Sequence, residues 1–228
     1  NALISDFKVF NRSLSLEEIT QIYQESLLGE DNTVKDGLVL HLPLNLESTV
    51  TNRVLDLSGN KYHGTFRGTK ISSVNPYRLN SCIYFDGVDD YINVPWGNNF
   101  NPYENDLTIL CVVKPIDDTN DQMIAGAVVG TNQRFYIGIR TNNWGIGISS
   151  VGWNGSIDAT TNWQFVYLII ESGIARLYVD FVQSQIISFT SYNLASNLKL
   201  GDWYDSGYPF GGYMDSFEVH EGVLNISE

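Results

Sequence analysis

The chain has 228 residues, 43% of them hydrophobic, and its 26 acidic and 13 basic residues give a net charge of -13. This charge repels polyanions, so nucleic acid and anionic membrane surfaces are poor partners, and it attracts divalent cations. Solubility alone is the simpler explanation of the charge. No apolar run approaches the ~20 residues that a membrane span needs, so no membrane insertion is expected.

The first 29 residues predict a strand followed by a helix. A strand-like segment at 3–9 precedes Ser15, and Glu18 follows Ser15 by three positions, as in a capping box. Apolar residues then recur at helical spacing at Leu16, Ile19, Ile22 and Tyr23. The helix is expected to end before Gly29, and residues 30–36 predict a polar linker.

The strand-like segment near the start of the chain is repeated near its end. Residues 3–9 and 213–219 align without a gap when Phe7 is matched to Phe217. A repeat this far apart is a whole domain. We therefore predict that residues 1–29 are the closing strand and helix of a preceding copy, and that 37–228 form a complete domain. Such an organisation is common in extracellular arrays and fibres.

From residue 37 the sequence predicts short strands rich in Val, Ile, Tyr and Phe, with turn residues between them. The expected strands are 38–44, 81–85, 91–94, 107–114, 123–129, 134–140, 144–150, 164–171, 175–179, 183–189, 197–200 and 213–219. A hairpin is expected across Thr141-Asn142-Asn143, and another between 176–180 and 183–186. Many strands without intervening helices predict an all-β sandwich of jelly-roll type.

Several motifs in a fixed order resemble those of a known family. They are GLVLHLPL at 37–44, DLSGNKYHG at 56–64, FDGVDDYI at 85–92, the framework segments 107–109 and 162–166, and FGGYMDSF at 210–217. Together they resemble the laminin-G-like family of the concanavalin A-like lectin/glucanase superfamily, over residues 36–228. The resemblance implies a concanavalin A-like jelly roll of two antiparallel sheets. Val112 departs from the pattern, because the family often has tryptophan at this packing position.

The loop 56–64 is the best candidate for a calcium site. Ca²⁺ takes six to eight oxygen ligands, and the loop offers a carboxylate, an amide and a hydroxyl. Family members often place a structural calcium between this loop and an aspartate of the closing strand. The resemblance therefore implies Asp56, Asn60 and Asp215 as ligands, together with backbone carbonyls. The alternative is an Asx-type turn in which Asp56 accepts backbone N–H groups and Asn60 adopts left-handed geometry.

Asp86, Asp89 and Asp90 form a second acidic group, which predicts a hairpin turn first and a second cation site only as an alternative.

The two cysteines, Cys82 and Cys111, lie in apolar runs without zinc spacing. A buried pair of free thiols is favoured over a disulfide, because a large core needs no covalent link.

Aromatic residues near Gly, Asn, Asp and Pro are the candidate ligand contacts, because the C–H faces of pyranose sugars stack on flat rings. The candidates are Trp144, Trp153, Trp203, Tyr204 and Tyr208, and the segment 201–210 resembles a site most. Contact with a protein is an equal alternative, since Trp and Tyr are enriched at protein interfaces too.

The sequence does not favour catalysis. Glucanases of the superfamily have Glu-x-Asp-x-Glu or Glu-x-Asp-x-x-Glu on one strand, and the nearest segment, 104–106, lacks the last carboxylate. The three histidines are scattered, and no serine or cysteine occurs in the context of a nucleophile elbow.

We therefore expect a non-enzymatic, extracellular or surface-displayed module (secreted, cell-surface or virion fibre) of a repeating adhesive or fibre-forming protein. Its expected partners are copies of itself or neighbouring modules, with a glycan as a further partner. Assembly would be head-to-tail, by strand addition through Ile4, Phe7 and Val9. The alternatives are a carbohydrate-binding module attached to a glycoside hydrolase, and a divergent hydrolase.

Overall fold

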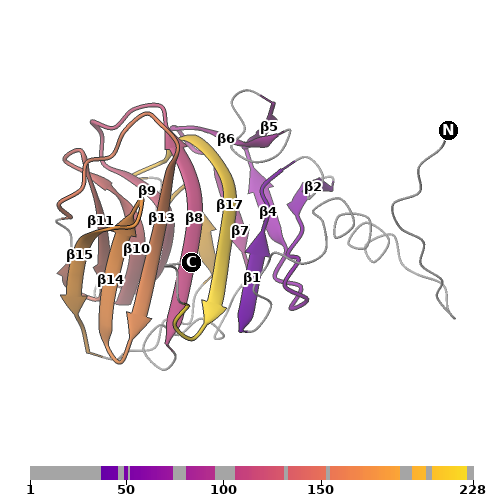
Figure 1. Ribbon diagram of the computed structural model, residues 1–228. Coiled ribbons are helices and arrows are strands. Elements are labelled where there is room, and N and C mark those ends of the chain that lie inside the picture. The colour runs from indigo at the N-terminus through magenta and orange to yellow at the C-terminus, as the bar shows by residue number, and fades with distance from the viewer. Residues whose placement is uncertain are drawn as a thin grey trace, which may run out of the picture.

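Two antiparallel sheets packed face to face form the described part of the chain (Figure 1). The structure is a computed structural model that describes residues 37–45, 49–50, 52–73, 81–95, 106–130, 133–152, 155–190, 197–203 and 207–224. Within these ranges the regular structure is β-strand, which confirms the predicted all-β class. We find no helix there with the length and hydropathy to cross a bilayer.

The two sheets have eight and nine strands, respectively. The eight-stranded sheet runs β15 (Val182–Ser188), β14 (Ile174–Val179), β13 (Gln164–Glu171), β8 (Leu107–Pro115), β17 (Gly211–Glu221), β6 (Cys82–Asp86) and β5 (Lys70–Ser72), and β1 (Leu38–Leu42) also pairs with β17. The nine-stranded sheet runs β12 (Val151–Gly152), β11 (Asn143–Ile148), β10 (Gln133–Arg140), β9 (Gln122–Gly130), β16 (Leu198–Leu200), β7 (Tyr91–Val94), β4 (Gly64–Arg67), β3 (Arg53–Val54) and β2 (Thr49–Val50). This arrangement is the predicted jelly-roll sandwich.

Both predicted hairpins are confirmed. The first has a two-residue turn, not the predicted three-residue loop, because Arg140 pairs with Asn143. Thr141 and Asn142 both have positive φ, at 46° and 70°, and this combination fits the turn type that matches the twist of two paired strands. The turn between β14 and β15 is built in the same way, with φ of 48° at Asp180 and 69° at Phe181.

Five short strands are absent from the sequence prediction: β2, β3, β4, β5 and β12. Each has only two to four residues. A segment this short shows too few alternations of apolar and polar residues to be recognised. These strands extend the two sheets, and β4 contributes to the surface described below.

The core lies between the two sheets and is built from alternate residues of each strand. On β10 the inward residues are Phe135, Ile137 and Ile139, all fully buried. Trp144 of β11 is also fully buried, and its Nε1 donates to Oε1 of Gln164 on β13 at 2.9 Å. This hydrogen bond joins the two sheets through the core and satisfies the polar end of the indole.

Cys82 and Cys111 are buried free thiols, as predicted. They lie on β6 and β8, which are separated by β17. The Cys111 thiol donates to the carbonyl oxygen of Val166 at 3.3 Å. Burial raises the pKa of the Cys82 thiol to about 12 and raises the pKa of the Cys111 thiol as well.

The N-terminal predictions lie outside the described residues. They comprise the strand at 3–9 with Ile4, Phe7 and Val9, the helix, and the linker at 30–36. The division of the chain at residue 37 also stays a prediction.

The thiols provide a test of the fold. Because only the thiolate is a good nucleophile and burial holds both groups protonated, the folded protein at pH 8 should release no thionitrobenzoate from Ellman's reagent within minutes. In guanidinium chloride both thiols should react at once. Rapid reaction of one thiol in the folded protein would show that its strand is not packed as described.

Candidate ligand-binding site

The outer face of the nine-stranded sheet is defined by the register of its strands. One row of residues pairs in succession across β11, β10, β9, β16, β7 and β4: Gly147, Tyr136, Gly126, Lys199, Asn93 and Thr65. The chain neighbours of Tyr136 and Lys199 belong to the core. Because successive side chains in a strand point to opposite faces, this row points away from the core. We call this surface the outer face.

Two glycines of this row give aromatic rings room against the backbone. A Cβ at Gly126 would lie 2.8 Å from Cδ1 of Trp203, and a Cβ at Gly147 would overlap the ring of Tyr136. Any other residue at these positions would push the rings away from the sheet. Trp203 and Tyr136 therefore rest directly on the strands.

An aromatic cluster forms around Trp203. The ring centroid of Trp203 lies 5.2 Å from that of Tyr136, in an edge-to-face arrangement, and 5.9 Å from that of Tyr208. The guanidinium of Arg134 lies 5.7 Å from the Tyr136 centroid and 5.9 Å from the Trp203 centroid. Met123 is buried against Tyr136 and Trp203. We call these five residues the Trp203 cluster.

The segment on both sides of Trp203 is tied to β9. The Gly201 N–H donates to the carbonyl of Ile124, and the Met123 N–H donates to the carbonyl of Tyr208, both at 2.9 Å. Phe210 follows in the chain and is fully buried. Trp203 and Tyr208 are therefore held close to the sheet, with Tyr208 37% exposed.

A second aromatic group lies further along the outer face, on β7. The ring of Tyr91 has Nζ of Lys199 at 4.4 Å and the guanidinium of Arg67 at 5.5 Å from its centroid. Arg67 also donates to the Tyr91 hydroxyl at 3.4 Å. Cations and rings therefore occur together in both aromatic groups.

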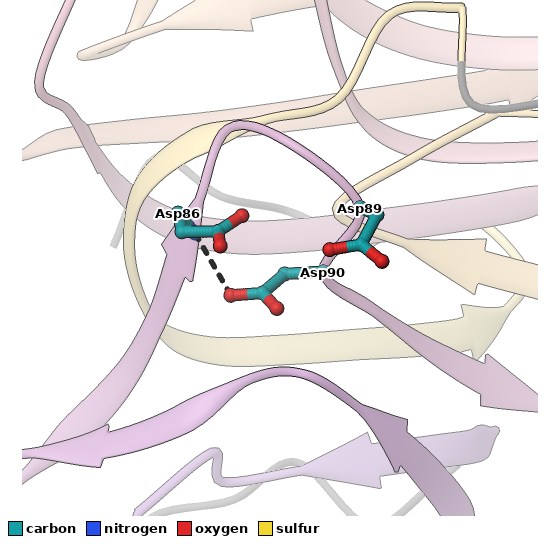
Figure 2. Close-up of side chains that lie close together, drawn as sticks. All are labelled: Asp86, Asp89 and Asp90. Atoms are coloured by element: carbon teal, nitrogen blue, oxygen red, sulfur yellow. Dashed lines mark hydrogen bonds between the residues drawn. The ribbon is translucent and has the colours of Figure 1, made fainter.

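Asp86 is the last residue of β6, and Asp89 and Asp90 lie in the connection that leads from β6 in one sheet to β7 in the other (Figure 2). Carboxylate oxygens of all three lie within 4.8 Å of one another. Asp86 accepts the Val88 N–H at 2.8 Å, and Asp90 accepts the Asp86 N–H at 2.9 Å. Burial raises the pKa of Asp90. These bonds form a tight turn, but the predicted hairpin is wrong, because β6 and β7 belong to different sheets and do not pair. The second cation site stays an alternative.

An acidic cavity adjoins this turn. Its volume is about 280 Å³, and it is lined by Asp86, Gly87, Ile116, Asp117, Asn120, Asp121, Gln122, Pro209 and Gly211. Pro209 follows Tyr208 of the Trp203 cluster directly in the chain. The segment 207–211 therefore contributes Tyr208 to the Trp203 cluster and Pro209 and Gly211 to the cavity.

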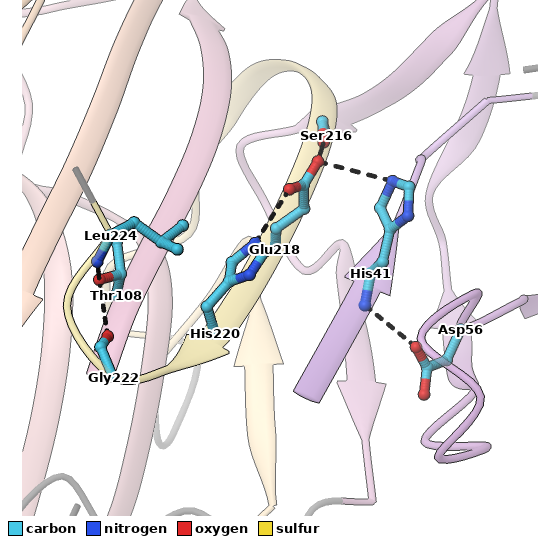
Figure 3. A network of polar contacts seen from close by, with 8 residues as sticks. All are labelled: His41, Asp56, Thr108, Ser216, Glu218, His220, Gly222 and Leu224. Atoms are coloured by element: carbon cyan, nitrogen blue, oxygen red, sulfur yellow. Dashed lines mark hydrogen bonds and ion pairs between the residues drawn. The ribbon is translucent and has the colours of Figure 1, made fainter. Parts of the chain in front are cut away.

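A buried polar network lies on the eight-stranded sheet (Figure 3). Glu218 lies between two histidines, with Nε2 of His220 at 3.3 Å and Nε2 of His41 at 3.6 Å. The Ser216 hydroxyl donates to the same carboxylate at 3.2 Å. A Ser-His-acid triad requires the serine to contact the imidazole, whereas Ser216 contacts the carboxylate. The network therefore lacks the order of contacts that activates a serine.

The loop 56–64 is held by Asp56, which is 1% exposed. Its Oδ1 accepts the N–H groups of His41 at 3.0 Å and Ser58 at 2.9 Å, and its Oδ2 accepts that of Tyr62 at 2.9 Å (Figure 3 shows the bond to His41). This is the geometry of the Asx-type alternative. The left-handed residues are Gly59 and Lys61, not Asn60 as predicted.

The other two predicted calcium ligands have their own surroundings. Asn60 donates from Nδ2 to the carbonyl of Val39 at 2.9 Å. Asp215 is 1% exposed and lies on β17. Calcium binding by Asp56, Asn60 and Asp215 stays a prediction.

Comparison with protein families decides where the chain belongs. Residues 86–228 match the laminin G family model described as the concanavalin A-like lectin/glucanases superfamily. The chain belongs to this family. No curated protein sequence matches this laminin G-like chain.

Several solved structures have a similar fold. The binding domain of Paraclostridial Mosquitocidal Protein 1 is 16% identical, with a TM-score of 0.66, and the match covers 85% of this chain and 51% of that one. Domain 4 of AbnA, an extracellular GH43 arabinanase from Geobacillus stearothermophilus solved with arabinotriose, is 19% identical, with a TM-score of 0.60 and coverages of 82% and 94%.

A third similar structure concerns botulinum neurotoxin type C, whose cell entry depends on interaction with two ganglioside molecules. It is 16% identical, with a TM-score of 0.62, and the match covers 84% of this chain and 49% of that one. The laminin G-like chain thus spans about half the length of the toxin structures. At these identities the likeness shows the fold alone.

The structure confirms the surface position of only some of the predicted aromatic residues. It brings Trp203 and Tyr208 together on the outer face. The prediction that Trp144 contacts a ligand is wrong, because its side chain is fully buried, donates a hydrogen bond to Gln164 and has no surface for a ligand. Trp153 and Tyr204 lie outside the described residues.

Sequence reasoning missed Arg134 and Tyr136. The signal was present in β10, where Arg134, Tyr136 and Gly138 alternate with the apolar Phe135, Ile137 and Ile139. This alternation places both residues on the outer face of the sheet.

Replacement of Asp56 tests the loop. Asp56→Ala leaves three N–H groups without their acceptor, so we expect it to lower the free energy of unfolding by about 3 kcal/mol or more, or roughly 6–12 °C in Tm. Differential scanning calorimetry measures the change, and Asp89→Ala, at an exposed aspartate, is the control. An unchanged Tm would contradict the role of these bonds.

The same measurement in calcium and in chelator separates the two interpretations of the loop. If the turn alone is present, Asp56→Ala lowers Tm equally in both buffers. If the predicted site binds calcium, the metal raises the Tm of the unsubstituted protein, and Asp56→Ala and Asp215→Ala each remove that increase.

Proposed function

We propose that the chain is a non-catalytic recognition module of an extracellular protein, and that it binds carbohydrate at the Trp203 cluster. The observation behind the proposal is that Trp203 and Tyr208 lie together on the outer face, packed against the buried Tyr136 and with Arg134 beside them. Sugar rings stack on aromatic faces, and nearby polar groups orient them.

The similar structures support this proposal. The arabinanase domain was solved with arabinotriose, and the neurotoxin type C requires gangliosides for cell entry. A further similar structure, the binding domain of botulinum neurotoxin DC, was solved with rat synaptotagmin II. A protein ligand is therefore the alternative occupant of the outer face, and the following experiment separates the two.

Removal of the central ring tests carbohydrate binding. Because truncation of a buried aromatic contact typically costs more than 1 kcal/mol of binding free energy, Trp203→Ala should weaken binding to the best ligand of a glycan array about tenfold. Isothermal titration calorimetry measures the affinity. Phe181→Ala is the matched control, because Phe181 is 64% exposed on the turn after β14 of the other sheet.

Two results would contradict the proposal. One is a glycan affinity that Trp203→Ala leaves unchanged or that Phe181→Ala reduces equally. The other is release of reducing sugar from the bound glycan, which would indicate a hydrolase.

A structural role in an adhesive or fibre-forming protein is a second proposal, supported by the repeated segments 3–9 and 213–219. The second copy forms part of β17, which pairs with β6, β8 and β1 inside the eight-stranded sheet. An edge that accepts an added strand can join modules head-to-tail.

Deletion of residues 1–30 tests assembly. If these residues join neighbouring copies, the full chain should form oligomers or filaments in light scattering and negative-stain images, and the shortened chain should be monomeric. A full chain that stays monomeric at all concentrations would contradict assembly and leave carbohydrate binding untouched.

A further inference from the structure

The outward side of the eight-stranded sheet is apolar. Antiparallel sheets commonly bury one face and hydrate the other, so that apolar and polar residues alternate along each strand. β13 instead has an unbroken apolar run at 165–170, and β8 has one at 109–113. Runs of this kind are typical of strands that are buried on both faces.

The register of the strands defines this second surface. Tyr178, Tyr167 and Leu110 pair in succession across β14, β13 and β8. Each lies between two residues of the core, so their side chains point away from it. We call this surface the apolar face. Its apolar side chains are Leu110, Val112, Phe165, Tyr167, Ile169, Tyr178, Phe181 and Ile186.

Aromatic rings form part of the apolar face. Tyr167 and Tyr178 stack with their centroids 4.8 Å apart, and the Phe165 centroid lies 5.3 Å from that of Tyr167. Phe181 adds its ring from the turn after β14, 5.6 Å from that of Phe165. Phe181 has a φ of 69°, which disfavours bulky side chains, and it is 64% exposed. The chain therefore presents a large ring at a position where glycine would fit with less strain.

The size of the apolar face fits one helix. It extends over β8, β13, β14 and β15, or about 14 Å, and from Phe165 to Ile169 along β13, or about 14 Å. The resulting area of about 200 Å² is a quarter of the ~800 Å² that each partner buries in a standard interface, so a second copy of the sandwich fits poorly. A helix of about 14 residues is about 21 Å long and about 10 Å wide, which matches the apolar face.

The sequence predicts such a helix outside the described residues. It lies at 15–28 and has an apolar stripe of Leu16, Ile19, Ile22 and Tyr23. An isolated helix of this length is marginal in water, so it needs a partner for its stripe.

The connection is long enough for this helix to reach the apolar face. Residues 30–36 link it to Gly37, whose carbonyl oxygen accepts the Glu221 N–H at the end of β17. β1 pairs with β17, and β17 pairs with β8, so β13 lies three strand spacings from β1, or about 14 Å. Residues 30–36 span up to about 23 Å when extended.

The internal repeat provides an independent reason to place a helix there. The alignment of Phe7 with Phe217 also matches Leu14 with Leu224, so the helix at 15–28 corresponds to the segment that begins after Leu224. The Leu224 N–H donates to the Thr108 hydroxyl at 3.0 Å (Figure 3), and Thr108 pairs with Ile169 of the apolar face. The helix of a repeat would therefore begin at the margin of this face.

We propose that the helix at 15–28 docks on the apolar face of its own chain, with its apolar stripe against the rings and aliphatic side chains there. Docking buries the apolar runs of β8 and β13 on both sides. The inference goes beyond the proposed function and does not depend on it, because the Trp203 cluster lies on the other sheet and assembly is proposed for the strand at 3–9.

Hydroxyl-radical footprinting of the full chain measures whether the apolar face is covered. In a variant with Ile19→Glu and Ile22→Glu, the two charges oppose burial of the stripe, so Phe165 and Tyr178 should be oxidised severalfold faster than in the unsubstituted chain. The matched control has Gln21→Glu and Gln24→Glu, which add the same charge away from the stripe and should leave both rates unchanged. Oxidation of Tyr208 in the Trp203 cluster is the internal reference.

Circular dichroism of the same proteins gives a second readout. Because the undocked helix is marginal, Ile19→Glu with Ile22→Glu should remove the helical signal, and the glutamine control should keep it. Ile186→Glu, at a position that is 55% exposed on the apolar face, should act in the same way. Val151→Glu is its control, since Val151 is 43% exposed on β12 of the other sheet. The thiols Cys82 and Cys111 should stay unreactive in every variant, which shows that the sandwich is folded.

Three results would overturn the inference. The first is equal oxidation of Phe165 and Tyr178 in the two helix variants, and the second is a helical signal that none of the substitutions changes. The third is protection that increases with protein concentration, because the helix would then lie on another copy, which light scattering would detect. None of these results affects the glycan affinity measured for Trp203→Ala, so failure of docking and failure of carbohydrate binding are distinguishable.

Discussion

The antiparallel register of β9, β10 and β11 is the constraint on which both the core and the candidate site depend. It places Phe135, Ile137 and Ile139 in the core and Tyr136 on the outer face. A slip by one residue would exchange the two sets, because side chains alternate between faces. The two-residue turn at Thr141-Asn142 fixes the register at one end, and burial of the apolar set opposes any slip.

The outer face combines aromatic rings with basic side chains, and each kind of group contributes something to ligand binding that the other lacks. Rings on a flat sheet offer area but little direction, and exposed cations offer direction but little free energy in water. The two kinds of group lie in contact on this face. Arg134 lies over the rings of Trp203 and Tyr136, and Lys199 lies over the ring of Tyr91. The glycines at 126 and 147 make this arrangement possible, because side chains there would displace the rings.

Much of the fold could be predicted from the sequence, because long alternating segments such as 134–140 and 164–171 show which residues face the core. The candidate site could be predicted only in part. Trp203 and Tyr208 stand out in the sequence because turn residues surround them. Tyr136 and Arg134 can be assigned to the site only when the pairing of β10 with β9 and β11 is known. The prediction for Trp144 was wrong because Asn143 and Gly145 flank it in the chain, and such residues are typical of exposed turns. The short strands β2 to β5 depend on sheet pairing that no local pattern shows.

The described strands of the two sheets contain eight basic and five acidic residues. The net charge of -13 therefore comes from residues outside these strands. Substitutions in those segments can change the charge of the molecule without changing the alternation of side chains that builds the core.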